Sequence, residues 1–293
     1  MLGHKVFQIL RTQYPGTLTT TLEDVRQAPL DRVSLLQGND VIGGVDATDF
    51  ARLGALLNEI RPHFIVNCIG IVKQRKESAQ AITSITINSL LPHVLAELAS
   101  HWGGNIIHPS TDCVFSGRHG SYTEEDPPDA DDLYGKSKEL GELPELENAL
   151  TLRTSIVGRE LTNFGSLLEW LLSQRGGTIH GYSRVIYAGV TTNQFARVAG
   201  WLIANFPSLS GLYHLTADAI PKFQLLTMLR DAYGLDVRIV PDDTVVSDRS
   251  MLGGKLRNAT GYITPPWPTL VSEVASDPTP YDEWTERIAT GLR

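Results

Sequence analysis

The sequence has few of the features that mark secreted, disulfide-stabilised or membrane-spanning proteins. Its 293 residues include only two cysteines, Cys68 and Cys113, which are too few for a disulfide framework and form no C-x-x-C pair. It contains no run of eighteen apolar residues and no basic leader followed by an apolar stretch, so neither a membrane span nor a signal peptide is predicted. We therefore expect a soluble protein of the cytoplasm.

Positive charge is also in short supply, with 25 Lys and Arg residues against 33 Asp and Glu and a formal net charge of −8. This balance argues against nucleic acid or an anionic membrane as the main partner. It leaves room for an anionic small molecule, because a few local arginines suffice to hold a phosphate. The eight histidines show no metal-ligand spacing, so no metal site is predicted, and we interpret His4, His108 and His214 as structural.

Short apolar runs alternate with stretches of helical periodicity in the first half of the chain. Residues 63–68, 105–108 and 149–153 are apolar runs of strand length, and apolar side chains recur at helical spacing over 87–99. This alternation is typical of βαβ units. The same reading predicts strands at 16–22 and 41–45 and a helix at 50–60. We expect an α/β fold with a doubly wound, Rossmann-like parallel sheet that binds ligands at the carboxyl ends of its strands.

The N-terminus departs from the usual start of such a domain, which is a strand and a glycine-rich turn that meets a pyrophosphate. Residues 1–7 are already patterned as the start of a helix, and Gly3 resembles the last glycine of such a turn. The first strand is therefore expected to be absent. Either the true start lies upstream of Met1 or the strand is really missing. We favour an upstream start, because losing a central strand would leave backbone groups unpaired.

The pattern loosens after residue 158, where helical stretches are separated by many turn-forming residues. We divide the chain into an N-terminally truncated dinucleotide-binding domain over 1–157 and a smaller C-terminal lobe over 158–293. The lobe is expected to bind mainly substrate. Segments around 186–215 are expected to return to the sheet.

The strongest chemical signal is the pair Tyr134 and Lys138 in the segment Y-G-K-S-K. On a helix, this i, i+4 spacing places both side chains on one face, whereas Lys136 points elsewhere. A lysine beside a phenol favours the phenolate and is expected to lower the pKa of Tyr134 towards neutrality. Such a tyrosine can protonate a carbonyl oxygen as hydride reaches the carbon.

Two hydroxyl residues, Ser110 and Thr111, directly follow the predicted strand that ends at His108. A hydroxyl at that sheet edge could hydrogen-bond the same substrate oxygen that Tyr134 protonates, and so stabilise the negative charge that develops there. The competing interpretation is that both residues only cap a turn.

The ordered combination of these motifs resembles the extended short-chain dehydrogenases, specifically the dTDP-4-dehydrorhamnose reductase family. The resemblance covers nearly the whole chain and thins after residue 220. The matching segments are V-D-A-T-D (45–49), V-N-C-I-G (66–70), I-N-S-L-L-P (87–92), S-T-D-C-V-F-S-G (110–117), E-E-D-P-P (124–128), L-Y-G-K-S-K-E-L-G-E (133–142), L-R-T-S-I-V-G (152–158) and G-L-Y-H-L (211–215).

The resemblance implies a catalytic set made of Thr111, Tyr134 and Lys138. It also implies NAD or NADP as cofactor, which Tyr134 and Lys138 would help to bind. The further cofactor-binding residues implied or expected are Gly3 at the phosphates, Glu23 at the ribose 2′-hydroxyl, Asp46 near the adenine, and Asn67, Cys68 and Ile69 along the cofactor. An acidic residue at position 23 would favour NAD over NADP.

The expected substrate is a nucleotide-activated 4-keto sugar, whose keto group NAD(P)H would reduce. Ser110, Arg184 and Arg249 are the candidate substrate-binding residues, since arginines bind diphosphate oxygens well. Family members often have a tryptophan where this chain has Ile156, which argues against dTDP-4-dehydrorhamnose itself as the substrate. A homodimer is a possible assembly.

Two alternatives remain open. A sugar-nucleotide epimerase would use the same fold, whereas a dehydratase is disfavoured because Cys113 occupies the place of its glutamate. The family also includes a non-catalytic, NAD(P)-binding regulatory subunit that serves a partner enzyme, and a damaged phosphate loop would suit that role.

Overall fold

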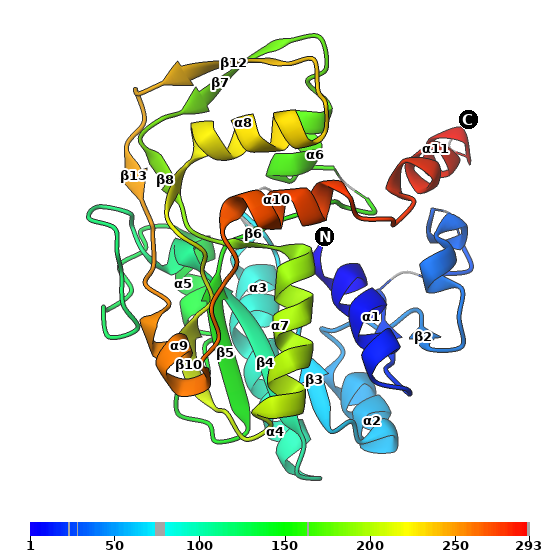
Figure 1. Ribbon diagram of the computed structural model, residues 1–293. Helices are drawn as coiled ribbons and strands as arrows, with labels where there is room; N and C mark the ends of the chain where they lie inside the picture. Colours follow the sequence, from blue (N-terminus) through cyan, green and yellow to red (C-terminus); the bar gives the residue numbers. More distant parts are fainter. Residues whose placement is uncertain (23, 28, 74–79, 163, 292–293) are drawn as a thin grey trace.

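A parallel sheet forms the centre of the computed structural model, which describes residues 1–22, 24–27, 29–73, 80–162 and 164–291 (Figure 1). Four strands pair in the order β10-β5-β4-β3, all of them parallel. Their bounds are Phe64–Val66 (β3), Asn105–Thr111 (β4), Ala149–Thr154 (β5) and Gly211–His214 (β10). The predicted α/β fold with a parallel sheet is confirmed.

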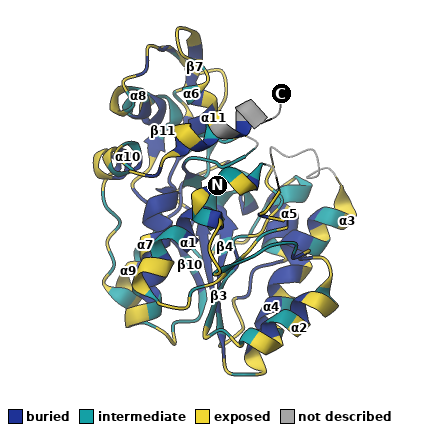
Figure 2. Ribbon diagram, turned by 90° about the vertical axis from the view of Figure 1, so that its right-hand side faces the viewer, coloured by how far each residue is buried: buried dark blue, intermediate teal, exposed yellow. Residues whose placement is uncertain are grey.

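The central strands are buried on both faces, which is why they lack the alternating polarity of a half-exposed strand. Every residue of β5 is buried. In β4 the adjacent residues Ile106 and Ile107 pack into different clusters, one on each side of the sheet. Figure 2 shows this arrangement as dark strands between helices whose outer faces are exposed.

One face of the sheet is covered by α2 (Phe50–Ile60) and a long helical stretch. That stretch runs from α3 (Ala81–Ser84) through the π-helical turns of η4 (Ile85–Leu90) into α4 (Leu91–Ser100). Helix α2 begins at Asp49, whose carboxylate accepts from the backbone N–H of Arg52 at 3.0 Å, the usual N-cap arrangement.

The stretch Ala81–Ser100 is long and apolar enough by length and composition to cross a membrane, which the search for apolar runs did not anticipate. In this fold 44% of its most apolar eighteen-residue segment is buried inside the protein. Its residues Ile87, Leu91 and Leu95 pack with the sheet residue Ile106. It therefore serves here as a core helix.

The other face is covered by α1 (Leu2–Gln13) and α7 (Thr192–Asn205), which pack against each other (Figure 1). Their contact is apolar, with Val6 and Leu10 of α1 in the same cluster as Phe195 and Leu202 of α7. As predicted, the chain begins with a helix. Strands β1 (Thr19–Thr20) and β2 (Val41–Ile42) follow it and form a separate parallel pair.

A second lobe lies above the sheet in Figure 1 and has a core of its own. Leu168, Leu225 and Leu270 are fully buried there, one from each of three helices. The helices are α6 (Leu167–Leu172), α8 (Lys222–Ala232) and α10 (Trp267–Ala275). The strands are β7 (Thr178–Tyr182) paired with β12 (Arg238–Asp242), and β8 (Val185–Tyr187) between β11 (Ile220–Pro221) and β13 (Ser247–Asp248).

The remaining elements connect the lobes or cover their edges. Strands β6 (Ile156–Val157) and β9 (Val190–Thr191) form a parallel pair between the lobes. Helix α9 (Gly254–Thr260) lies against β10. Helix α11 (Tyr281–Gly291) packs against the short helices η1 (Leu30–Arg32) and η2 (Ser34–Leu36), which ties the C-terminal end to the N-terminal part.

Candidate active site

The candidate catalytic residues meet at the carboxyl edge of the sheet. Thr111 is the last residue of β4, and its register partner on β5 is Thr154. The 3-10 turn η5 (Asp112–Val114) follows, and the Thr111 hydroxyl accepts from the Cys113 N–H at 3.1 Å to cap it. The capping interpretation is thus correct for Thr111, whose hydroxyl donates in turn to the Asp112 carboxylate at 3.2 Å and lowers the pKa of the nearby Tyr134.

Tyr134 lies in the first turn of α5 (Leu133–Glu139), whose N-cap is Asp132. The Asp132 carboxylate accepts from the Gly135 N–H at 2.8 Å and so fixes the start of the helix. Burial raises the pKa of Tyr134 and the nearby Cys113 raises it further, whereas Thr111 acts in the opposite direction. The expectation that a lysine lowers the pKa of Tyr134 is therefore wrong for this structure, because the lysine amine is engaged elsewhere.

Lys138 is buried beneath the same helix and reaches towards β4. Its Nζ donates to the Pro109 carbonyl at 2.9 Å and lies 3.3 Å from Nε2 of His108. Burial lowers the pKa of Lys138 to about 8, while the nearby Glu142 carboxylate acts in the opposite direction. Lys136 is exposed, as the helical spacing predicted.

The residues expected along the cofactor follow β3, at the same edge of the sheet. Asn67 is buried, Cys68 is half-buried and Ile69 is 40% exposed. A Cβ atom on Gly3 would lie 3.4 Å from the Cβ of Cys68, so the N-terminal turn of α1 packs directly on the end of β3. The structure brings these four residues together, although they come from two distant segments of the chain.

Of the two other expected cofactor residues, Asp46 and Glu23, only Asp46 is among the described residues. Asp46 is exposed in the turn after β2, where its carboxylate accepts from the N–H and hydroxyl of Thr48, which lowers the pKa of Asp46. Glu23 lies outside the described residues. Cys68, in contrast, is held as a neutral thiol, because burial raises its pKa to about 12.

Ser110, an expected substrate ligand, is instead part of the core. Its hydroxyl donates to Oε1 of Glu142 at 2.6 Å. Glu142 in turn forms a buried, two-point ion pair with Arg153, with contacts of 2.8 and 2.7 Å. Since its hydroxyl is committed to this network, Ser110 is poorly placed to bind substrate, and the structure favours Thr111 for that contact.

The two arginines expected at the substrate differ in their placement. Arg249, just after β13, is half-buried and donates from Nε to the Phe115 carbonyl at 2.8 Å. Its charge lowers the pKa of Asp112, which burial otherwise raises. Arg184 is exposed between β7 and β8. Only Arg249 is therefore tied to the residues that follow Thr111.

Sequence reasoning missed Lys222, the first residue of α8, which also lowers the pKa of Asp112. No local motif surrounds Lys222. Its place beside the site depends on how the second lobe packs above the sheet, which only the structure shows.

Comparison with known proteins bears on the identity of this site. A family model described as the RmlD substrate binding domain matches residues 8–244. The chain belongs to this family. The resemblance inferred from the sequence motifs is thereby confirmed.

Individual relatives share about a quarter to a third of their aligned residues with this chain. Methionine adenosyltransferase 2 subunit beta of Danio rerio is 31% identical over 195 residues, which cover 61% of this chain and 58% of that protein. The dTDP-4-dehydrorhamnose reductase of Aggregatibacter actinomycetemcomitans is 26% identical over 182 residues, covering 59% and 62%. The chain thus spans about three fifths of the length of these curated relatives.

Among solved structures, the dTDP-4-dehydrorhamnose reductase of Bacillus anthracis in complex with NADP has a TM-score of 0.71 to this chain at 22% identity. The match covers 87% of this chain and 96% of that one. This structural likeness supports the fold described above for this chain.

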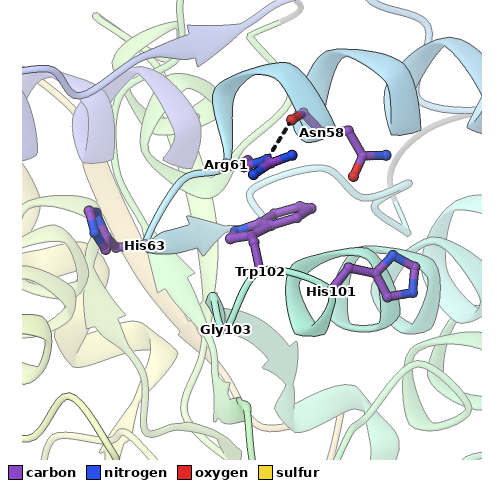
Figure 3. Close-up of a pocket in the computed structure, with 6 residues that line it drawn as sticks. All are labelled: Asn58, Arg61, His63, His101, Trp102 and Gly103. Atoms are coloured by element: carbon purple, nitrogen blue, oxygen red, sulfur yellow. Dashed lines mark hydrogen bonds between the residues drawn. The ribbon is translucent and has the colours of Figure 1, made fainter.

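A cavity of about 360 Å³ lies elsewhere, at the amino ends of β3 and β4 (Figure 3). The Trp102 indole lies in its centre and donates to the Pro62 carbonyl at 2.9 Å, and the Arg61 side chain extends over the indole. The lining residues are Asn58, Arg61, His63, His101, Trp102 and Gly103. Because Thr111 lies at the other end of β4, this cavity is separate from the candidate active site.

Proposed function

We propose that this protein uses NADH or NADPH to reduce the keto group of a nucleotide-activated 4-keto sugar. The observation that carries the proposal is the proximity of Thr111 and Tyr134 at the carboxyl edge of the sheet, where Thr111 influences the pKa of Tyr134. Lys138 lies on the same helix as Tyr134. Membership of the RmlD family and the reductases among the relatives support it.

The residues after β3 fit a dinucleotide cofactor. The close contact of Gly3 with Cys68 brings the N-terminal end of α1 to the sheet edge, where unpaired backbone N–H groups and the helix dipole favour a phosphate. The solved relative from Bacillus anthracis was crystallised with NADP. When bound, the cofactor supplies the hydride. Asn67, Cys68 and Ile69 would line its path towards Tyr134.

The chain itself supplies the proton. With its pKa raised, Tyr134 is protonated at neutral pH and can donate its hydroxyl proton to the substrate's carbonyl oxygen. The Thr111 hydroxyl, which donates to the Asp112 carboxylate here, would turn to donate to the same oxygen and stabilise its developing charge. Arg249 faces the site from the second lobe and is the candidate contact for the substrate diphosphate.

The proposal is tested by following NAD(P)H oxidation with dTDP-, UDP- and GDP-linked 4-keto sugars. We expect Tyr134→Phe to lower kcat by about 10²- to 10⁴-fold, the usual contribution of a positioned general acid. Lys136→Met changes an exposed residue of the same helix and serves as the matched control. Full turnover by Tyr134→Phe would overturn the mechanism, and epimerised sugar without net cofactor oxidation would indicate an epimerase.

A second candidate function is that of an accessory subunit. It is favoured by the relatives named methionine adenosyltransferase 2 subunit beta. That role predicts NAD(P) binding without turnover on any keto sugar and co-purification with a methionine adenosyltransferase. Turnover that depends on Tyr134 would exclude a purely non-catalytic role.

A further inference from the structure

Tyr187 is the last residue of β8, and its hydroxyl is buried without a hydrogen-bond partner among the residues that the structure describes. The residue is 6% exposed, and its ring lies in the core of the second lobe, 5.6 Å from the Trp267 ring. A phenylalanine would fill the same apolar space without burying a hydroxyl, which loses its hydrogen bonds to water on burial. The packing of the core therefore gives no reason for the hydroxyl.

The acceptor near this hydroxyl is already fully used. Gly189 lies beside both groups, because a Cβ atom there would overlap the Ser155 carbonyl oxygen and lie 2.8 Å from the Tyr187 hydroxyl. That carbonyl oxygen accepts from the Val190 N–H at 2.8 Å and from the Thr154 hydroxyl at 3.2 Å. Since a carbonyl oxygen has two lone pairs, it has none left for the tyrosine.

The hydroxyl of Tyr187 also lies near the edge of the sheet where the candidate catalytic residues meet. Ser155 directly follows Thr154, which is the register partner of Thr111 on the neighbouring strand. Burial raises the pKa of Tyr187, Ser155 acts in the opposite direction, and two groups of the turn η5 after Thr111 raise it further. The phenol therefore keeps its proton at neutral pH and can donate it in a hydrogen bond.

We propose that Tyr187 binds the substrate by donating its hydroxyl to a ring hydroxyl of the sugar, at C2 or C3. This inference deepens the proposed function and rests on it. The sugar is the expected partner, rather than the nucleotide, because Tyr187 lies close to the strand ends that carry Thr111 and Thr154. A hydrogen bond at this place would hold the keto carbon in one orientation towards Tyr134. Solvent does not reach the hydroxyl, so the second lobe must shift slightly as the sugar enters.

The first test needs no substrate and compares two tyrosines of the second lobe. Tyr233 packs against the same core, but its hydroxyl donates to the Val274 carbonyl at 2.9 Å. Tyr233→Phe should lower the midpoint of urea denaturation, because it removes this hydrogen bond. Tyr187→Phe should leave the midpoint unchanged or raise it. Any fall in the midpoint of Tyr187→Phe would show that its hydroxyl stabilises the fold itself, and would overturn the inference.

The second test follows NAD(P)H oxidation with the nucleotide-linked 4-keto sugar that the wild type uses. A hydrogen bond to a ring hydroxyl forms equally in the bound substrate and in the transition state. Tyr187→Phe should therefore raise KM about tenfold, the equivalent of one hydrogen bond, and leave kcat nearly unchanged. Tyr233→Phe should change neither constant. An unchanged KM in Tyr187→Phe would overturn the inference.

Sugars that lack one hydroxyl separate direct contact from an indirect structural effect. Tyr187→Phe and the wild type should have the same KM for either the 2-deoxy or the 3-deoxy form of the substrate, whichever lacks the hydroxyl that Tyr187 binds. A rise in KM that persists with both deoxy sugars would mean that Tyr187 acts through the fold, and would overturn the inference.

The proposed function and this inference fail in different ways. If the wild type reduces a keto sugar and Tyr187→Phe does so with the same KM, only the inference fails. If the wild type reduces none of the dTDP-, UDP- and GDP-linked 4-keto sugars, the proposed function fails, and calorimetry with the same compounds decides the inference. Weaker binding by Tyr187→Phe would then support it, whereas equal affinities, or no binding by either protein, would overturn it.

Discussion

Two polar networks lie side by side beneath the candidate site, and both include a residue of β4. One joins Ser110 to Glu142 and Arg153, and the other joins His108 to Lys138 and Asn67. His108 and Ser110 are two positions apart on the strand, so their side chains lie on the same face of the sheet. The networks differ in how their charges are balanced.

The network of Ser110 has a complete ion pair. The side chains of Arg153 and Glu142 are 3% and 6% exposed, and two parallel contacts join them. The guanidinium also lies over the Phe115 ring, with Cζ 5.0 Å from its centroid. A paired charge of this kind can remain ionised inside the protein.

The network of His108 has a buried amine that forms no ion pair with any carboxylate among the residues that the structure describes. The Lys138 amine contacts a carbonyl and a neutral imidazole, so burial penalises its charge. The comparison indicates that the first network stabilises the fold, whereas the second bears an energetic cost at the site of chemistry. Functional sites commonly carry such costs.

The largest effect on stability should come from breaking the complete pair. Glu142→Ala leaves the Arg153 guanidinium buried and unpaired, and we expect the free energy of unfolding to fall by about 3–5 kcal/mol. Urea denaturation measures it. The exposed pair Arg118–Asp131 is the control, since Asp131→Ala should cost less than about 1 kcal/mol. Similar small losses from both variants would show that the buried pair adds nothing.

Removing the amine of Lys138 should have the opposite sign. Because burial lowers the pKa of Lys138 from 10.5 to about 8, the folded protein bears a cost of about 3 kcal/mol wherever the group stays charged. Lys138→Met keeps most of the apolar stem. We expect it to raise the free energy of unfolding by about 2–3 kcal/mol at pH 7, while Lys136→Met changes little.

The stability difference between the wild type and Lys138→Met should depend on pH. Below about pH 8 both the folded and the unfolded chain hold the Lys138 proton, so the full cost is present. Between pH 8 and 10.5 the folded protein releases this proton before the unfolded chain does, and the wild type gains stability relative to Lys138→Met. Denaturation at pH 7 and pH 10 measures this change. A difference between the two proteins that stays constant across this range would contradict it.

The sequence predicted the part of this arrangement that depends on local patterns. Apolar runs identified strands at 105–108 and 149–153, which the structure extends to Thr111 and Thr154, and helical spacing separated buried Lys138 from exposed Lys136. Motif order predicted the family. These features depend on residues a few positions apart, and over that range the spacing of apolar residues indicates helices, strands and their buried faces.

The networks could not be predicted, because their partners are far apart in the chain. Ser110 lies 32 residues from Glu142, and His108 lies 41 residues from Asn67. Whether Ser110 faces substrate or a core carboxylate depends on the register of β4 against α5. Which way the Lys138 amine turns depends on the same packing, and so the expected effect of Lys138 on the pKa of Tyr134 was wrong.

A second buried ion pair, outside the candidate site, tests whether burial alone distinguishes Lys138. Lys5 on α1 lies 2.7 Å from the Asp277 carboxylate, which also accepts from Asn193. These contacts lower the pKa of Asp277 to about 2, against the burial that would raise it. Burial likewise lowers the pKa of Lys5, but Asp277 opposes this change, so Lys5 has a charged partner, which Lys138 lacks within the described part of the chain.

We therefore expect Asp277→Asn to destabilise the protein by about 1–2 kcal/mol at pH 6, the smallest of the three effects. The stabilisation by Asp277 is present above the unfolded-state pKa of 3.8 and is lost as pH falls through about 2, so most of the difference between the two proteins should be gone at pH 2.5. Urea denaturation at pH 6 and pH 2.5 measures it. Equal destabilisation at both pH values would mean that Asp277 acts through packing, and a stabilising Asp277→Asn would mean that a carboxylate partner does not offset the burial of a lysine here.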